Sequence, residues 1–375
     1  MGDLLINAAR LRDTFRALVL VNGPSRQEGE IARLVTSLLA EQGIAVEMDD
    51  AAGALDGEVG NLIARVPGTY DAAPLLFSVH LDTVEPTAGI KLVETANEIA
   101  TDGSTILGAD DRAGVAVLIE LVRTLRENGI PHPPLELVFS VCEEIGVMGA
   151  QVLDYSLLQS RCGFVLDSSG GAGPLIVSAP AQQHLQVVVH GVAAHAGMAP
   201  ETGISAIAVA ARALARMKLG RIDAETTANI GTIHGGNATN IIADRVEMEG
   251  EARSRDPHKL QQQVEHMREC FISEAEAAGV HAEVTVTDVY PAFTLGEDSR
   301  PVQLASEALR ALGIEPILAA TGGGSDANFF NNRNIQAVLL PAGYQHPHTH
   351  REVLDVKQLE FLLQCVLRIV ELAGE

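Results

Sequence analysis

Carboxylates and histidines gather at the ends of apolar segments in this sequence. The run PLLFSVH ends in His80 and is followed by Asp82, and the run LELVFSVC leads directly into Glu143 and Glu144. Imidazole and carboxylate groups act as general acids and bases, and together they bind divalent metal ions of the zinc type. The residue types therefore indicate acid–base chemistry, with or without a metal.

Two adjacent aspartates, Asp110 and Asp111, stand in the stretch GADDRAG just before the apolar run VAVLIELVRTL. The ordinary role of an aspartate at this place is to cap free backbone N–H groups at the start of a helix. One aspartate suffices for that role, so the other is available as a ligand. A further carboxylate, Asp167, ends the apolar run CGFVLD.

The spacing of these residues bears on how they could act. His80 and Asp82 are two residues apart, so extended backbone points both side chains the same way. The adjacent residues Glu143 and Glu144 point in opposite ways, so one could bind a metal while the other faces a water molecule. Ligands of an open parallel sheet bind beyond the carboxyl ends of its strands. Carboxylates that meet there repel one another unless cations compensate, and a pair of Zn²⁺, Mn²⁺ or Co²⁺ ions would do so.

A second group of histidines lies in the stretch HPHTHRE near the C-terminus. Pro347 interrupts the group, and the segment does not have the spacing of a helical metal clip. We therefore expect one metal ligand from this loop rather than three.

The order of the elements predicts an α/β catalytic domain with a mostly parallel sheet covered by helices, at residues 1–180 and 293–375. Helices are expected at residues 4–18, at residues 27–42 and from Ala113 onward. Residues 181–292 contain half-exposed strands and amphipathic helices instead of fully apolar strands. They predict an inserted, smaller α+β domain of ferredoxin-like β-α-β-β-α-β order, which would serve as a lid or dimerisation domain.

The composition and net charge argue against some classes of binding partner. The chain has 375 residues, 47% of them hydrophobic, and a net charge of −23. Such a charge argues against binding to nucleic acid or to an anionic membrane surface. No apolar run approaches the length of a membrane span, and no leader peptide is recognisable at the N-terminus. Four dispersed cysteines without a CxxC pair fit free thiols in a reducing cytoplasm.

Five motifs in order, HLDTV, GADDRAG, CEEIG, VLDSS and HTHRE, resemble the dizinc aminoacylase, carboxypeptidase and deacylase family of metallohydrolases. The branch is similar to peptidase T, and the likeness spans nearly the whole chain. The resemblance implies a metallopeptidase that releases the N-terminal residue of tripeptides. It also implies two divalent metal ions, zinc first, with manganese and cobalt as alternatives.

The resemblance assigns ligands residue by residue. Asp110 would bridge the two ions. His80 and Asp167 would bind one of them, whereas Glu144 and His348 would bind the other. His346 and His350 are then loop residues, because the motif requires a histidine four residues before a glutamate, and only His348 with Glu352 meets it.

The resemblance also implies catalytic roles. Asp82 would orient His80, and Glu143 would be the general base beside a water shared by both metals. The family's aspartate motif often has lysine where this chain has Arg112, which keeps the charge but removes an ammonium group. The family pattern further predicts a cis peptide bond between Asp110 and Asp111.

Family segments of the inserted domain imply that His195 in GVAAHAGMAP reaches an active site across a homodimer. Asn240 and Arg253 would contact the small peptide substrate, although Asn240 could instead cap a turn and Arg253 could pair with Glu251. The stretch TGGGSDAN would line the pocket through Gly323, Gly324 and Ser325.

Alternatives of other kinds remain. An N-acyl amino acid hydrolase or a carboxypeptidase would use the same residues on another substrate. A serine hydrolase built on Ser325 lacks the G-x-S-x-G elbow. A non-catalytic protein that binds metal or peptide would keep the ligands without turnover.

Overall fold

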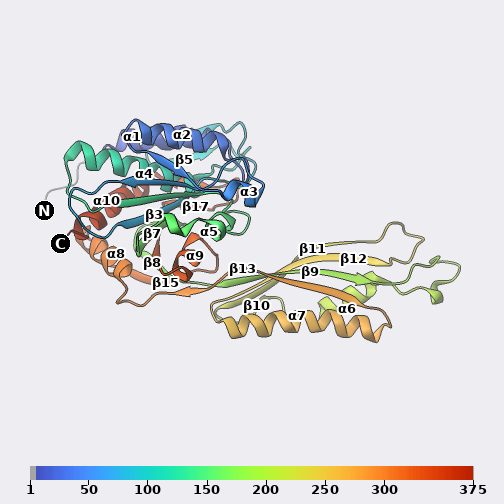
Figure 1. The fold of residues 1–375 in the computed structure, drawn as a ribbon. Helices are drawn as coiled ribbons and strands as arrows, with labels where there is room; N and C mark the ends of the chain where they lie inside the picture. The colour runs from blue at the N-terminus through green and yellow to red at the C-terminus, as the bar shows by residue number, and fades with distance from the viewer. Residues whose placement is uncertain (1–5, 375) are drawn as a thin grey trace. The chain divides into compact units, whose positions relative to one another are not determined.

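The computed structural model describes residues 6–374, which form two compact units. The larger unit comprises Met1–Ser178, Thr294–Thr321 and Ser325–Glu375, and the smaller comprises Ala179–Phe293 with Gly322–Gly324. Figure 1 shows the elements of each unit along the chain. Within the described residues, no helix is long and apolar enough to cross a membrane.

A mixed sheet of nine strands forms the centre of the larger unit. In chain order its strands are β1 (Val46–Met48), β2 (Leu62–Val66), β3 (Leu75–His80), β6 (Leu135–Ser140), β7 (Cys162–Ser168), β8 (Pro174–Ala179), β14 (Phe293–Thr294), β15 (Ile317–Ala320) and β16 (Gln336–Pro341). The spatial order is β1-β2-β6-β3-β7-β16-β8-β14, with β15 beside β8. Strand β3 runs parallel to both β6 and β7, and β7 runs parallel to β16. The parallel middle of the sheet therefore brings several strand ends to one edge.

Helices cover both faces of this sheet. They are α1 (Ala8–Val19), α2 (Gly29–Ala40), α3 (Ala51–Leu55), α4 (Ala109–Asn128), α5 (Met148–Val152), the 3₁₀ turn η1 (Tyr155–Leu157), α8 (Arg300–Ala311), α9 (Asp326–Asn332) and α10 (Val356–Leu372). Val79 of β3 lies against Gly114 of α4, whereas Ser78 is hydrogen-bonded to Asp326 of α9. Neighbouring strand residues point to opposite faces, so α4 and α9 cover opposite faces of β3. Both faces of the sheet are thus buried. This explains why the sequences of β3 and β6 are mostly apolar and do not alternate with polar residues.

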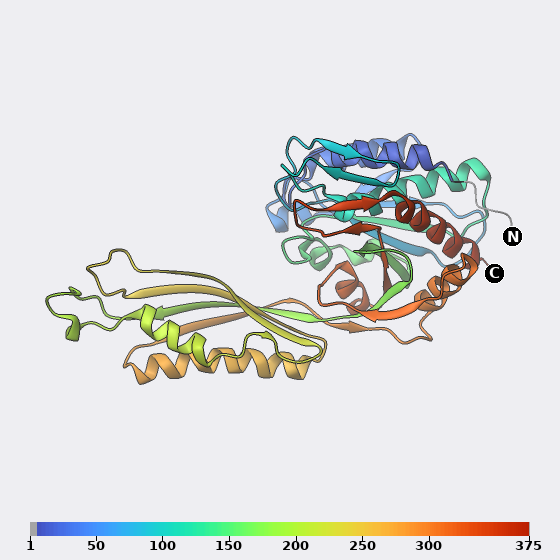
Figure 2. The same cartoon turned by 180° about the vertical axis from the view of Figure 1, so that it is seen from behind.

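A second, four-stranded sheet of the larger unit was not predicted from the sequence. It consists of β4 (Leu92–Glu94), β5 (Glu98–Thr101), β17 (Tyr344–Gln345) and β18 (Val353–Asp355), in the order β17-β18-β5-β4. Figure 2 shows its two late strands in red near its two early strands in cyan. Strands of two to four residues carry too little periodicity to be recognised in a sequence.

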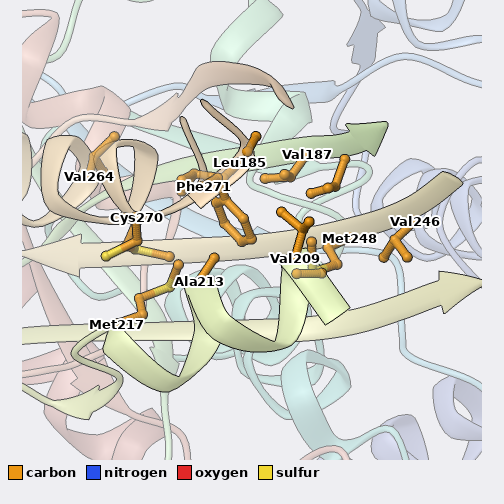
Figure 3. Packing of buried hydrophobic residues seen from close by; sticks show 14 of the residues in the cluster. Leu185, Val187, Val209, Ala213, Met217, Val246, Met248, Val264, Cys270 and Phe271 are labelled. Carbon is orange, nitrogen blue, oxygen red and sulfur yellow. The ribbon is translucent and has the colours of Figure 1, made fainter. Parts of the chain in front are cut away.

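The smaller unit contains β9 (Ala181–His190), the 3₁₀ turn η2 (Pro200–Thr202), α6 (Ala206–Arg216), β10 (Gly220–Arg221), β11 (Thr226–Gly235), β12 (Arg245–Ser254), α7 (Pro257–Ala277) and β13 (Ala282–Tyr290). Its antiparallel sheet has the order β10-β11-β12-β9-β13. Leu185, Val187 and Val189 alternate along β9 and are almost fully buried. Figure 3 shows the first two of them in one cluster with Phe271 of α7 and Val209 of α6. Both helices therefore cover one face of the sheet and leave the other face open.

The predicted α/β class with an added α+β part is confirmed, and the order of the smaller unit matches except for the added two-residue strand β10. The first predicted helix begins later than expected, at Ala8, and residues 4 and 5 of that prediction lie outside the described residues. The helix expected from Ala113 is α4. Its bounds begin at Ala109, but Asp110 and Asp111 have non-helical φ and ψ, so the continuous helix starts at Arg112, close to the predicted residue.

Candidate metal centre and active site

Two parallel strands and the start of α4 position the first group of predicted ligands. His80 is the last residue of β3 and lies beside Ser140, the last residue of β6. Asp167 lies near the end of β7, on the other side of β3. The Nε2 atom of His80 is 3.1 Å from Asp110 Oδ1 and 3.9 Å from Asp167 Oδ1. These three side chains form a compact group that could hold one cation.

A second group shares Asp110 with the first. His348 Nε2 is 3.0 Å from Glu144 Oε2 and 3.3 Å from Asp110 Oδ2. The two oxygens of Asp110 therefore face different histidines, His80 through Oδ1 and His348 through Oδ2. In each group, ligand atoms lie within 4.8 Å of one another. A carboxylate in this position could be shared by two cations, one held by each group.

Asp82 lies behind these ligands and is completely buried. Its Oδ1 accepts a hydrogen bond from the backbone N–H of Glu143, and its Oδ2 accepts bonds from the backbone N–H of Glu144 and from Ser25 Oγ. The Nδ1 atom of His80 bonds to the backbone oxygen of Asp82 at 2.9 Å. An Nδ1–H donor there leaves Nε2 unprotonated and directed at the ligand group, as metal-binding histidines require.

Glu143 belongs to neither ligand group among the described residues. Burial raises the pKa of its carboxyl well above the usual range, and the negative charges of Asp167, Glu144 and Asp326 act in the same direction, while His80 opposes them. A carboxyl group with a raised pKa is suited to take and return a proton near neutral pH.

The first residues of α4 carry the shared aspartate on non-helical backbone. The peptide bond between Asp110 and Asp111 is cis, as predicted. Glu352, only 2% exposed, accepts hydrogen bonds from the backbone N–H groups of Gly108 and Asp110. Asp111 belongs to neither ligand group of the described residues; it accepts hydrogen bonds from the backbone N–H groups of Gly114 in α4 and of His80. The two aspartates thus divide the roles, since Asp111 caps the helix start and Asp110 faces both histidines.

The charge balance of the site fits bound cations. Burial raises the pKa of both Glu144 and Asp167, and Asp110 raises them further. The Oε1 atom of Glu144 is buried and has no hydrogen-bond partner among the described residues. Carboxylates and imidazoles without a thiolate are the donor set of zinc, manganese or cobalt in hydrolytic sites. These residues therefore suit a pair of divalent metal ions.

The other histidines of the C-terminal loop lie apart from both ligand groups. His346 is exposed, and His350 Nδ1 is 3.0 Å from the backbone oxygen of Gly103. Tyr344, just before this loop, is buried, and its hydroxyl donates a hydrogen bond to Asp167 Oδ1. The sequence analysis missed this tyrosine, because its partner is distant in the chain.

Two further buried charged residues, Glu28 and Arg112, lie behind the site. Glu28 was not identified from the sequence, and Arg112 was noted there only as a replacement for lysine. Glu28 Oε1 accepts a hydrogen bond from the backbone N–H of Cys142, so Glu28 and Asp82 together bind three consecutive N–H groups. Arg112 is 1% exposed, and burial lowers its pKa to about 10 against the charges of Asp82, Glu28 and Asp111. In the sequence, Glu28 looks like an ordinary residue at the start of a helix. Only its tertiary contact with Cys142 shows that it supports the site.

In the smaller unit, His195 and Asn240 belong to adjacent exposed loops. The backbone N–H of Ala196 donates to the Asn240 oxygen, and His195 pairs with Ile241. His195 Nδ1 accepts hydrogen bonds from the backbone N–H groups of Gly197 and Met198. The proton of the neutral ring therefore lies on Nε2, which can act as a donor.

Arg253 lies at the opposite end of the smaller unit's sheet from Asn240. Asn240 precedes β12, and Arg253 is near its other end. Eight residues of strand, roughly 27 Å, separate Arg253 from Arg245, the first residue of β12. Arg253 makes a bidentate ion pair with Glu251 at 2.9 Å, the pairing that the sequence left open. One copy of the unit thus does not bring Asn240 and Arg253 together.

The glycine cluster has tight packing. A Cβ on Gly324 would collide with the ring of Tyr290. Gly322, the first glycine of the cluster, accepts a long hydrogen bond of 3.5 Å from Arg253. Ser325 is buried and is the N-cap of α9, so its observed position is structural, and the roles of Gly323, Gly324 and Ser325 toward a substrate stay predictions.

Comparisons with known proteins agree with this geometry. Residues 182–278 match a family model described as peptidase dimerisation domain, and residues 90–174 match one described as M42 glutamyl aminopeptidase. The chain is 39% identical to YqjE of Bacillus subtilis, over 99% of this chain and all of that protein. It belongs to the peptidase T-like M20 metallohydrolases.

Solved structures resemble this peptidase over their full length. Aminopeptidase PepT from Bacillus cereus is 41% identical, with a TM-score of 0.90 over 99% of this chain and 100% of that one. A tripeptidase from Staphylococcus aureus is 39% identical, with a TM-score of 0.94 over 98% of this chain and 99% of that one. Peptidase T of Pectobacterium atrosepticum is 28% identical over 74% of this chain and 68% of that protein. The peptidase carries a family dimerisation domain and groups of residues that could hold divalent metal ions.

Proposed function

We propose that this peptidase releases the N-terminal residue of tripeptides, using two metal ions held by the two ligand groups. The observation that carries the proposal is that Asp110 faces both histidine ligands while Glu143 remains outside both groups. Zinc is the first choice of metal, with manganese and cobalt as alternatives. The relatives whose names state aminopeptidase or tripeptidase activity support this choice of substrate.

The protein residues divide the chemical work. The metal pair, when bound, would polarise the peptide carbonyl and lower the pKa of the attacking water. Glu143 takes the proton of that water and passes it to the leaving amine. Asp82 holds the Glu143 backbone in place, and Tyr344 orients Asp167. His195 donates from Nε2 to the oxyanion that develops on the carbonyl.

A homodimer through the smaller unit would complete the site. This unit exposes the large apolar side chains of Val192, Met198, Ile207, Ile233 and Ile241. Several of them lie on the His195 and Asn240 loops, where a second copy would cover them. Since those loops are at the far end of the sheet from Arg253, we propose that His195 and Asn240 serve the partner's active site.

Substrate contacts at the other end would come from Arg253 and the glycine cluster. The guanidinium of Arg253 already pairs with Glu251, so a peptide carboxylate would have to compete with that pair or join it. The acidic net charge and the family relatives favour a cytoplasmic enzyme acting on small peptides.

A substrate comparison tests the proposal. A tripeptide with a free amino group, its N-acetylated form and an N-acetyl amino acid are each incubated with metal-loaded protein, and products are identified by mass spectrometry. Only the free tripeptide should lose its N-terminal residue, and a chelator should abolish the reaction. Release of a C-terminal residue would indicate a carboxypeptidase, and cleavage of the N-acetyl amino acid would indicate a deacylase.

Glu143→Gln provides the matched control for the base. It preserves size, so metal content should stay at the wild-type value while turnover falls by about 10²–10⁴-fold. Normal turnover in this variant would contradict the assignment of Glu143. Bound metal without turnover of any peptide by the wild type would indicate a binding protein instead.

A further inference from the structure

The smaller unit carries a third group of potential metal ligands, which is independent of the proposed catalytic pair. His190 is the last residue of β9, His281 directly precedes β13, and Glu283 is the second residue of β13. Their ligand atoms lie within 4.8 Å of one another. Within the described residues, this is the one such group outside the catalytic ligands.

Strand pairing places all three side chains on the open face of the sheet. Val189 and Val187 of β9 face the helices, so His190 points to the opposite face. Glu283 pairs with Val188, which is on that same open face, and the N–H of His190 donates to the oxygen of His281. Cross-strand neighbours share a face, so the two imidazoles and the carboxylate meet outside the core.

The distances suit a tetrahedral ion. Glu283 Oε1 is 2.9 Å from His190 Nε2 and 3.8 Å from His281 Nε2. Ligand atoms around a tetrahedral Zn²⁺ with bonds of about 2.0–2.1 Å lie roughly 3.3 Å apart, between these two values. The two rings are already stacked, with centroids 4.1 Å apart and planes inclined by 15°. Zinc binds in the plane of an imidazole ring, so the two stacked rings would have to turn away from parallel before both nitrogens could bind one ion.

We propose that His190, His281 and Glu283 bind a third Zn²⁺ ion, with one coordination position left open to solvent. Two imidazoles and one carboxylate are a zinc ligand set, whereas calcium and magnesium prefer oxygen ligands. Arg245 of β12 is the strand partner of His190 and brings a positive charge near the site. Its guanidinium is bound to Glu247 at 2.6 Å, which offsets that charge.

The position of the ion indicates its effect. Strand β13 is an edge strand that pairs only with β9 among the strands of its sheet. An ion bound by the end of β9 and the start of β13 would hold the edge strand in register and reduce its local opening. The consequence is a smaller unit whose stability depends on zinc.

The test compares zinc content in tag-free, full-length protein dialysed against buffered Zn²⁺. His281→Ala removes an exposed ligand, and Glu283→Gln is a second variant that keeps the side-chain size. His258→Ala is the matched control, because His258 is also exposed in this unit but belongs to no ligand group of the described residues. The wild type and the control should each bind one zinc per chain more than the two ligand variants.

Amide hydrogen exchange gives an independent readout. Zinc should slow exchange in β13 of the wild type and of His258→Ala, and should have no such effect in the ligand variants. Equal zinc content in all four proteins would overturn the proposal. The criterion is a difference of one ion, so it is unaffected if the proposed catalytic pair fails to bind two.

Discussion

Asp82 Oδ1 accepts a 2.9 Å hydrogen bond from the backbone N–H of Glu143, so a buried carboxylate positions the proposed general base. The other oxygen of Asp82 accepts a bond from the N–H of Glu144, a predicted metal ligand. The same residue bonds to His80 through its backbone oxygen. Asp82 therefore links the positions of two predicted ligands and the proposed base, and it belongs to neither ligand group of the described residues.

Asp82→Asn should reduce kcat by roughly 10²-fold, because an amide cannot accept hydrogen bonds through its nitrogen and the loop of Glu143 would shift. Metal content and circular dichroism should change little. Ser25→Ala is the control, since it removes one donor to Asp82 and leaves the carboxylate intact, and its kcat should stay within about tenfold of wild type. An equal loss in both variants would show that the backbone contacts with Asp82 are unimportant.

Arg112→Met should destabilise the protein by about 3–5 kcal/mol, because the buried carboxylates of Asp82 and Glu28 would lose their nearby cation. Arg112→Lys keeps the charge and should be much less affected. Adding Glu28→Gln to Arg112→Met removes one uncompensated carboxylate and should restore part of the loss. Urea unfolding of the wild type, Arg112→Met, Glu28→Gln and the double variant measures the coupling, and purely additive effects would refute it.

Asp326 predicts a pH dependence in metal-free protein. Its carboxylate accepts hydrogen bonds from Ser78 and Ser140, yet burial raises its pKa from 3.8 to about 6. Because the folded state holds this proton more tightly, the contribution to stability is complete below pH 3.8 and is lost as the pH rises through about 6.

Asp326→Asn remains neutral and can accept both serine bonds, so it should not show that loss. Above the transition it should be more stable than wild type by about 3 kcal/mol. Denaturant unfolding of chelator-treated protein between pH 4 and 8 measures the difference, with exposed Asp50→Asn as the control. Parallel curves for wild type and Asp326→Asn would contradict the raised pKa.

Mixed dimers test whether His195 acts across the proposed interface. His195→Ala and Glu143→Gln proteins should each be nearly inactive. Unfolding them together and refolding should restore up to about a quarter of wild-type activity, because half of the chains would form hybrids with one intact site. Refolding each variant alone is the control. Absence of recovery, with dimers present by size-exclusion chromatography, would indicate that each chain uses its own His195.

The sequence alone was sufficient to predict the fold class of this protein and most of its candidate metal ligands. Apolar runs defined the buried strands, and the predicted α/β class and its smaller α+β part followed from their order. The motifs around His80, Asp110 and Glu144 indicated metal ligands, because strand ends of a parallel sheet converge on one edge. Local periodicity and residue chemistry are properties that a sequence carries directly.

Tertiary structure decided which residues from distant parts of the chain lie next to one another. It placed Asp110 beside both His80 and His348 and Asp111 against the N–H of Gly114, and it showed Asn240 and Arg253 at opposite ends of one sheet. Short strands, buried partners such as Glu28, and the cross-strand His190 group depend on pairing between distant segments. A sequence does not record which distant groups meet, because packing and strand register determine those contacts.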